Sequence, residues 1–132
     1  MKMAIKMGNT SAKYEEVREF LDRLKNWLVF LNGYVIYEAR PKNEQFMLDM
    51  EWTSADKKKE WLLRLVPEDY YEGPDENEMP GQEPVWKFGK RIDGKLCYIK
   101  IYMLRKPNVY CISFHWAEHD MYLPLKHLTE KI

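Results

Sequence analysis

The sequence predicts an α+β fold in which N-terminal helices pack on one face of a small antiparallel β-sheet. Apolar residues recur at helical spacing in the first half of the chain, whereas three runs in the last third alternate apolar and polar residues at period two. With 132 residues, of which 45% are hydrophobic and 14% aromatic, the chain can bury a core of its own. We therefore expect residues 1–132 to form a single domain.

The first helix is expected to follow a mobile start over residues 1–10. Ser11 can cap it, and it should run to about Leu31, where Asn32-Gly33 is a typical helix stop. Its apolar residues recur at the spacing of one helix face: Tyr14, Val17, Leu21, Leu24 and Leu28.

Two further helices are expected before the strands. A short helix is predicted over residues 43–50. The next helix should begin at Thr53, because Thr53 and Asp56 have the spacing of a capping box, and it should end at Pro67. Residues 72–84 are rich in Asp, Glu, Gly and Pro, which predicts an exposed acidic loop.

Three strands are expected over residues 84–90, 96–103 and 109–115, and they should form an antiparallel meander. Asp93-Gly94 is a strong two-residue hairpin signal between the first and second of them. A further strand, on the edge of the sheet, is expected near residues 34–38.

The hairpins predict which residues face each other. Lys100 should lie opposite both Lys87 and Ser113, and Tyr98 opposite His115. A four-residue second loop would also pair Leu104 with Val109, and Ile101 with Ile112. The apolar face of the meander is then Trp86, Phe88, Ile99, Ile101, Ile112 and Phe114. In this register Cys97 and Cys111 point to opposite faces, so free thiols are expected.

The opposite face gathers Lys87, Tyr98, Lys100, Ser113 and His115, which we call the polar cluster. Two lysines directly opposite each other repel, and an anion between them would relieve the repulsion. The simpler alternative is that both amines extend into water, where salt screens them. The cluster suits the binding of a phosphate with proton transfer beside it. We therefore expect His115, Tyr98, Lys100 and Lys87 to be catalytic, and substrate to be bound by Lys90, Arg91, Ser113 and Tyr102.

Charge is distributed unevenly, although the formal net charge is zero. Residues 1–83 hold 12 basic and 17 acidic residues, whereas residues 84–132 hold 9 basic and 4 acidic residues. This asymmetry indicates that the predicted sheet meets an anionic molecule. Since no apolar run is long enough to span a bilayer and no secretory signal opens the chain, a soluble cytoplasmic protein without membrane contact is expected.

Four segments resemble the MqsR-like toxins of bacterial type II toxin–antitoxin systems. They are Glu68-Asp69-Tyr70-Tyr71-Glu72-Gly73-Pro74, Val85-Trp86-Lys87-Phe88-Gly89-Lys90, Tyr98-Ile99-Lys100-Ile101 and Cys111-Ile112-Ser113-Phe114-His115-Trp116-Ala117-Glu118-His119. The resemblance covers most of residues 40–124. It implies a RelE-like fold, cleavage of messenger RNA without a metal or other cofactor, and a partner antitoxin, with no direct contact to DNA.

The resemblance also assigns positions one at a time. Tyr98 and Lys100 match the Tyr-x-Lys strand motif of these toxins, in which the tyrosine is functionally important. His115 and Lys87 fall where the best-known member has a functional lysine and a functional glutamine. Glu72 falls where that member has a functional lysine, which reverses the charge at this position.

RNA can be cleaved with its own 2′-hydroxyl as the nucleophile, given a general base, a general acid and cations near the phosphate. His115 can serve as acid or base, and the sequence leaves open which role it has. Two other interpretations remain. The chain could be a non-enzymatic protein-binding module on a degenerate toxin fold, which Glu72 and the zero net charge favour. His115 and His119, four residues apart, could also share a metal, although no third ligand has suitable spacing.

Overall fold

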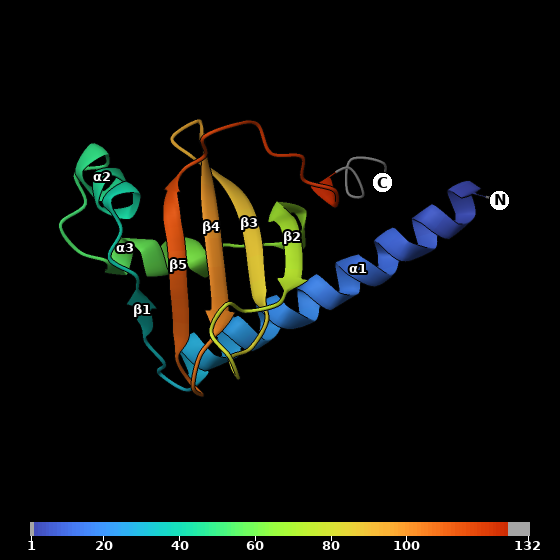
Figure 1. The fold of residues 1–132 in the computed structure, drawn as a ribbon, viewed down its shortest axis with the longest axis horizontal. Coiled ribbons are helices and arrows are strands. Elements are labelled where there is room, and N and C mark those ends of the chain that lie inside the picture. Colours follow the sequence, from blue (N-terminus) through green and yellow to red (C-terminus); the bar gives the residue numbers. More distant parts are fainter. Residues whose placement is uncertain (1, 127–132) are drawn as a thin grey trace.

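The computed structural model describes residues 2–126, and in them three α-helices pack with one five-stranded sheet (Figure 1). The elements in chain order are α1 (Lys2–Lys25), the π-helical turn η1 (Asn26–Phe30), β1 (Val35–Tyr37), α2 (Pro41–Asp49), α3 (Asp56–Leu62), the 3-10 turn η2 (Pro67–Asp69), β2 (Tyr70–Asp75), β3 (Val85–Ile92), β4 (Lys95–Met103) and β5 (Val109–Trp116). The strand order is β1-β5-β4-β3-β2. The predicted α+β class is confirmed. The sheet is mixed rather than antiparallel, because β1 runs parallel to β5.

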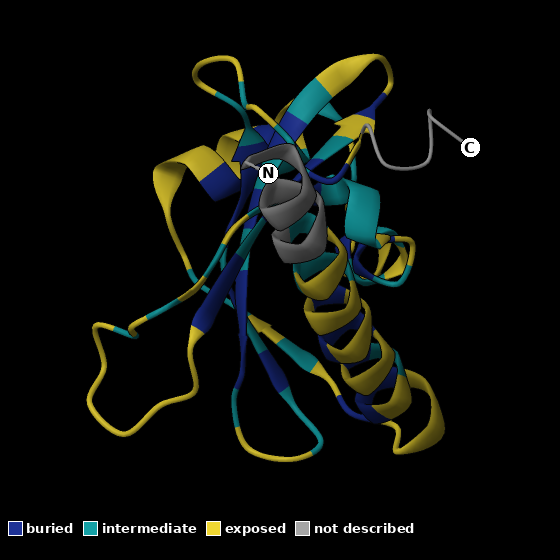
Figure 2. Ribbon diagram, turned by 90° about the vertical axis from the view of Figure 1, so that its right-hand side faces the viewer, coloured by how far each residue is buried: buried dark blue, intermediate teal, exposed yellow. Residues whose placement is uncertain are grey.

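Helices α1 and α3 lie behind one face of the sheet in the view of Figure 1. Phe20 of α1 stacks on Trp86 of β3 with ring centroids 4.5 Å apart, and Leu62 of α3 is fully buried. Beyond the N-terminal turns that are drawn in grey, Figure 2 shows α1 with a buried and an exposed stripe, as expected for a helix with one face on a core. The opposite face of the sheet carries no helix among the described residues, and we call it the open face.

Helix α2 lies beside β5 at the end of the sheet where the short strand β1 stops (Figure 1). The side-chain amide of Asn43 donates to the carbonyl oxygen of Ile112 at 3.0 Å, and its oxygen accepts from the N–H of Phe114 at 2.9 Å. Asn43 therefore satisfies backbone groups of β5 that no strand pairs with. These bonds explain why a polar side chain is buried here.

The register of the meander agrees with most of the predicted pairs. Lys87 pairs with Lys100, Lys100 with Ser113, and Tyr98 with His115. The hairpin turn is Asp93-Gly94, with φ of 52° and 79°. Positive φ at both central residues is what a type I′ turn requires.

The second hairpin differs from the prediction. Met103 rather than Leu104 pairs with Val109, and the register shifts between Lys100 and Ile101. Because one residue of β5 is extra at this bulge, Ile101 pairs with Cys111 instead of Ile112. Cys111 is therefore buried on the same, helix-covered side as Cys97, so the prediction of opposite faces is wrong, and both are free cysteines.

Strand β2 lies partly in the segment predicted to be a loop over residues 72–84. It pairs with β3 through an irregular register, in which Glu72 lies opposite Lys87, and the exposed loop is limited to residues 76–84. Gly73-Pro74 made this segment a poor strand candidate. An edge strand tolerates such residues, because one side of its backbone needs no partner.

Several predicted helix boundaries are corrected, although α2 differs from the prediction by only one or two residues at each end. α1 begins at Lys2, so Ser11 lies inside this helix rather than at its cap, and the predicted end is confirmed by Asn32 with φ of 54°. α3 spans Asp56–Leu62, so it begins after Thr53 and ends well before the predicted stop at Pro67. The hydroxyl of Ser54 accepts from the N–H of Asp56 at 3.2 Å, which replaces the predicted capping box.

No helix within residues 2–126 combines the length and the apolar character needed to cross a bilayer.

Candidate functional site

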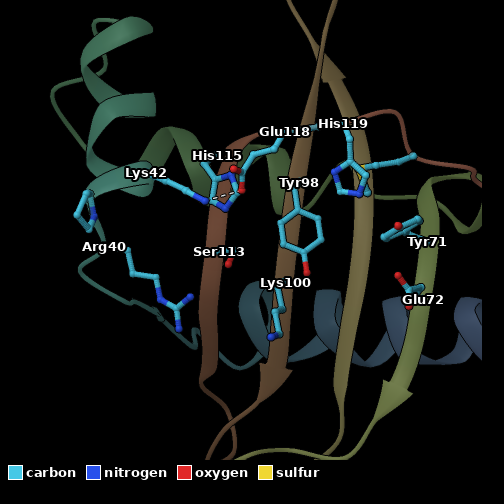
Figure 3. A pocket seen from close by; sticks show the side chains of 13 residues that line it. Arg40, Lys42, Tyr71, Glu72, Tyr98, Lys100, Ser113, His115, Glu118 and His119 are labelled. Atoms are coloured by element: carbon cyan, nitrogen blue, oxygen red, sulfur yellow. Dashed lines mark hydrogen bonds and ion pairs between the residues drawn. The ribbon is translucent and has the colours of Figure 1, made fainter.

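A hollow of about 570 Å³ lies on the open face of the sheet, over β4 and β5. We call it the His115 hollow. Its lining comes from several elements, as Figure 3 shows: Arg40, Lys42, Tyr71, Glu72, Tyr98, Lys100, Ser113, His115, Glu118 and His119, together with Pro41, Ala117 and Met121. Four of the five residues of the polar cluster, namely Tyr98, Lys100, Ser113 and His115, thus line one hollow.

His115 lies near the end of β5 with only 8% of its surface exposed. Its Nδ1 is 2.8 Å from the carbonyl oxygen of Trp116. A carbonyl oxygen can only accept, so this contact favours the tautomer with the proton on Nδ1. In the neutral imidazole, Nε2 then carries the lone pair. His115 is therefore arranged to accept a proton at Nε2.

Tyr98 is the cross-strand neighbour of His115, with ring centroids 5.5 Å apart. Its hydroxyl points toward the Lys100 side of the hollow (Figure 3). Burial raises the pKa of Tyr98 and the charge of Glu72 adds to this, although Lys87 acts in the opposite direction. The phenol therefore stays protonated at neutral pH and can donate a hydrogen bond or a proton.

The two lysines of the polar cluster differ in their contacts. Lys87 lies 3.2 Å from the carboxylate of Asp75, and it lines the neighbouring hollow rather than this one. Burial opposes the charge of Lys87, but the hydrogen bond with Asp75 and nearby negative charges leave its pKa raised. The side-chain amine of Lys100 makes no hydrogen bond or ion pair with any residue in the described part of the chain. Its amine is thus available to an anion in the hollow.

The rim contains residues that the sequence did not single out. Arg40 and Lys42 reach the hollow from the start of α2, and Lys42 forms a 2.5 Å ion pair with Glu118. The hydrogen bond from Lys42 lowers the pKa of Glu118. These cations lie far from the strands in sequence, so only the docking of α2 on β5 could place them here.

The remaining predicted site residues are divided between the two faces. Tyr102 lies on the open face, in the neighbouring hollow, and Arg91 lines a shallow depression beyond His119. Lys90 lies on the other side of β3, where its amine is 2.9 Å from Asp69 and 3.3 Å from the carbonyl oxygen of Arg64. The structure therefore does not bring Lys90 to the polar cluster. Because alternate residues of a strand share a face, Lys90 lies on the same face of β3 as Phe88. This alternation could have excluded Lys90 from the polar cluster at the level of sequence.

Cation ligands do not gather around His115. His119 lines the same hollow, but within residues 2–126 no group of three or more His, Cys, Asp and Glu side chains is placed to hold a metal ion. His115 also directs Nδ1 to a backbone oxygen. The geometry favours proton transfer at His115 over ligation of a shared ion.

No protein-family model, curated protein or solved structure matches this chain. The chemistry of the site therefore has to be argued from the geometry of the polar cluster. What this geometry offers in one hollow of the sheet is a proton acceptor, a protonated phenol and an amine that residues 2–126 leave without a partner.

Proposed function

We propose that this protein is an endoribonuclease that cleaves messenger RNA without a metal ion, on a RelE-like fold, as the MqsR-like toxins do. The observation that carries the proposal is the meeting of His115, Tyr98 and Lys100 in one hollow. A proton acceptor, a proton donor and a cation beside one phosphate are what cleavage by an RNA 2′-hydroxyl requires.

In the proposed reaction, Nε2 of His115 removes the proton of the 2′-hydroxyl, and the 2′-oxygen attacks phosphorus. The bond between phosphorus and the 5′-oxygen breaks, and the Tyr98 hydroxyl gives its proton to the leaving oxygen. A 5′-alkoxide is far more basic than a phenolate, so even a phenol of raised pKa can protonate it. The products are a 2′,3′-cyclic phosphate and a 5′-hydroxyl. Solvent then returns a proton from His115 to Tyr98.

Lys100 has the task of stabilising the phosphate. Charge accumulates on the non-bridging oxygens as the five-coordinate phosphorane forms. An amine with no partner among the described residues can stabilise this charge. Arg40 lines the same hollow, where its charge is shared with Glu38 through an ion pair. Lys87 acts from the adjacent strand, where its ion pair with Asp75 shares its charge.

The direct test is a cleavage assay on RNA in the presence of a chelator of divalent metals. We expect fragments ending in 2′,3′-cyclic phosphate, and no cleavage of an otherwise identical 2′-deoxy strand. His115→Ala and Lys100→Ala should each lower kcat/KM by about 10²- to 10⁴-fold, the range of a positioned acid, base or charge. Lys57→Ala, on an exposed lysine of α3, is the matched control. Variants that fold and cleave as fast as the parent protein would exclude this site.

The proposed partner of such a toxin is an antitoxin protein produced with it. Co-expression of the protein encoded next to it should restore growth that the toxin arrests, and the two should purify as one complex. His115→Ala should remove the toxicity and leave the complex intact.

A second candidate function is protein binding without catalysis. It is favoured by the acidic side chains on the open face, since Glu72 lines the His115 hollow and Asp75 is paired with Lys87. Under this alternative the purified protein never shortens RNA. Glu72→Lys separates the two functions, because it should strengthen RNA binding in a ribonuclease and weaken binding of a basic protein partner.

A further inference from the structure

A second hollow of about 500 Å³ lies on the open face next to the His115 hollow. Arg40 and Lys100 line both of them, so the two are adjacent and meet at these cations. An RNA strand with a phosphate at Lys100 would therefore place a neighbouring nucleotide in this second hollow. Its volume lies within the range of roughly 300–1,000 Å³ that is typical of small-molecule sites.

The floor of the second hollow is aromatic, and we call it the tyrosine hollow. Tyr102 and Tyr110, on adjacent strands, stack with ring centroids 5.1 Å apart and an interplanar angle of 21°. Met79 lines the same hollow from the exposed loop, and 61% of its surface is exposed. Tyr102 is only 5% exposed and Tyr110 is half-buried, so Tyr110 and Met79 offer the apolar surface against which a nucleobase can stack.

The polar group beside the tyrosines is the carboxylate of Glu38. The hydroxyl of Tyr110 donates to its Oε1 at 3.1 Å, and Arg40 donates to its Oε2. Two donors fix the carboxylate in place. Each carboxylate oxygen can accept more than one hydrogen bond, so Glu38 still has capacity for a donor from a ligand.

The surrounding charges define what kind of group can enter. Asp75, Glu76 and Glu78 also line the tyrosine hollow, while its cations lie on the side shared with the His115 hollow or on β3. A second phosphate would be repelled by these carboxylates. A neutral base with N–H donors on its edge would not be, because carboxylates accept such donors.

We propose that the tyrosine hollow holds the base next to the scissile phosphate and that Glu38 selects a base with an exocyclic amino group over uracil. This inference rests on the proposed ribonuclease function and adds a specificity residue to it. Cytosine and uracil are the sharpest pair for comparison, because they have similar shapes but carry an amino donor or a carbonyl acceptor at position 4. Uracil would direct that carbonyl oxygen at a carboxylate.

Binding and cleavage can be measured separately. Hexamers of cytidine or uridine in which fluorine replaces every 2′-hydroxyl cannot be cleaved by this route, and their affinity can be followed by fluorescence anisotropy. The parent protein should bind the cytidine hexamer about 10- to 100-fold more tightly, the usual effect of one well-placed polar contact to a base. Glu38→Gln should reduce this ratio to near one, because its amide can donate to the uracil carbonyl. Glu60→Gln, on the exposed surface of α3, should leave the ratio unchanged.

The outcomes separate the two proposals. If the parent protein cleaves RNA but binds both hexamers equally, or if Glu38→Gln keeps the full ratio, the selection by Glu38 is excluded and the ribonuclease stands. If the ratio depends on Glu38 but no RNA is cleaved, the base site stands and the ribonuclease is excluded. If neither hexamer binds, both are excluded.

Discussion

Lysines lie on both faces of the sheet, but their surroundings differ. On the helix-covered face, Lys90 forms an ion pair with Asp69 at 2.9 Å, and Lys58 lies against two aromatic rings. On the open face, the side-chain amine of Lys100 has no hydrogen-bond or ion-pair partner within residues 2–126. The lysines of the covered face thus contact side chains of the fold itself. The amine of Lys100 makes no such contact with the described residues, which is why we assign it to a ligand.

The largest effects are expected from substituting one aromatic side chain on each face. The covered-face variant should lose stability, and the open-face variant should lose activity. Phe88 is fully buried on the covered face, where it packs with Phe20 and Tyr70. Phe88→Ala should lower the free energy of unfolding by about 3–5 kcal/mol. Tyr98→Phe should change it by less than about 0.5 kcal/mol, and should instead slow RNA cleavage about 10²-fold or more. Urea unfolding and a cleavage assay on both variants check this.

The same comparison can be made with the lysines, at a smaller scale. Lys90→Met leaves the largely buried Asp69 with only its hydrogen bond from the N–H of Val66, and should cost about 1–2 kcal/mol of unfolding free energy. Lys100→Met should leave stability within about 0.5 kcal/mol or raise it slightly, because it removes repulsion with Lys87. Thermal and urea unfolding measure both. A larger cost for Lys100→Met would mean that its amine serves the fold.

Strand register was the part of the site that the sequence predicted best. Alternation over three strands and one Asp-Gly turn is enough to align Tyr98 with His115 and Lys100 with Ser113. A shift by one residue would have buried the lysines, so the hydrophobic pattern left few alternatives. The bulge at Ile112, between the paired residues Cys111 and Ser113, could not be predicted in this way, because a bulge adds a residue that the hydrophobic alternation does not reveal.

The contributions from outside the meander depended on tertiary packing. Arg40 and Lys42 reach the His115 hollow because Asn43 fastens α2 to β5. No local pattern in the sequence predicts the contact between Asn43 and β5. Glu38, which faces the tyrosine hollow, owes its position to the parallel pairing of β1 with β5, a long-range contact that propensity does not encode.

Lys58 is a cation on the covered face that has no carboxylate partner among the residues that the structure describes. Its surface is 3% exposed, and its amine lies 5.5 Å from the ring of Tyr37 and 5.3 Å from that of Phe114. Its hydrogen bond to the carbonyl oxygen of Asn43 is long, at 3.5 Å. Burial lowers the pKa of Lys58, because removal from water disfavours its charged form.

The lowered pKa of Lys58 predicts that the stability of the fold depends on pH. Since the pKa of Lys58 is lower in the folded chain, the unfolded chain holds its proton at pH values where the folded chain has lost it, and stability rises as pH approaches the ordinary lysine value of 10.5. Lys58→Met removes the buried charge and should raise the unfolding free energy at pH 7 by about 1 kcal/mol. The gain should shrink toward pH 10.5, since the parent protein is then relieved of the same charge.

Urea unfolding of the parent protein and of Lys58→Met between pH 6 and pH 10 would measure this gain directly. Lys57→Met is the control, because Lys57 lies next to Lys58 in sequence but is exposed and pairs with Glu60 on the surface. This variant should show no difference in stability that varies with pH. If Lys58→Met is less stable than the parent protein at every pH, the two rings hold the amine more strongly than water does. The covered face would then stabilise an unpaired cation, and the contrast with Lys100 would rest on access to ligand alone.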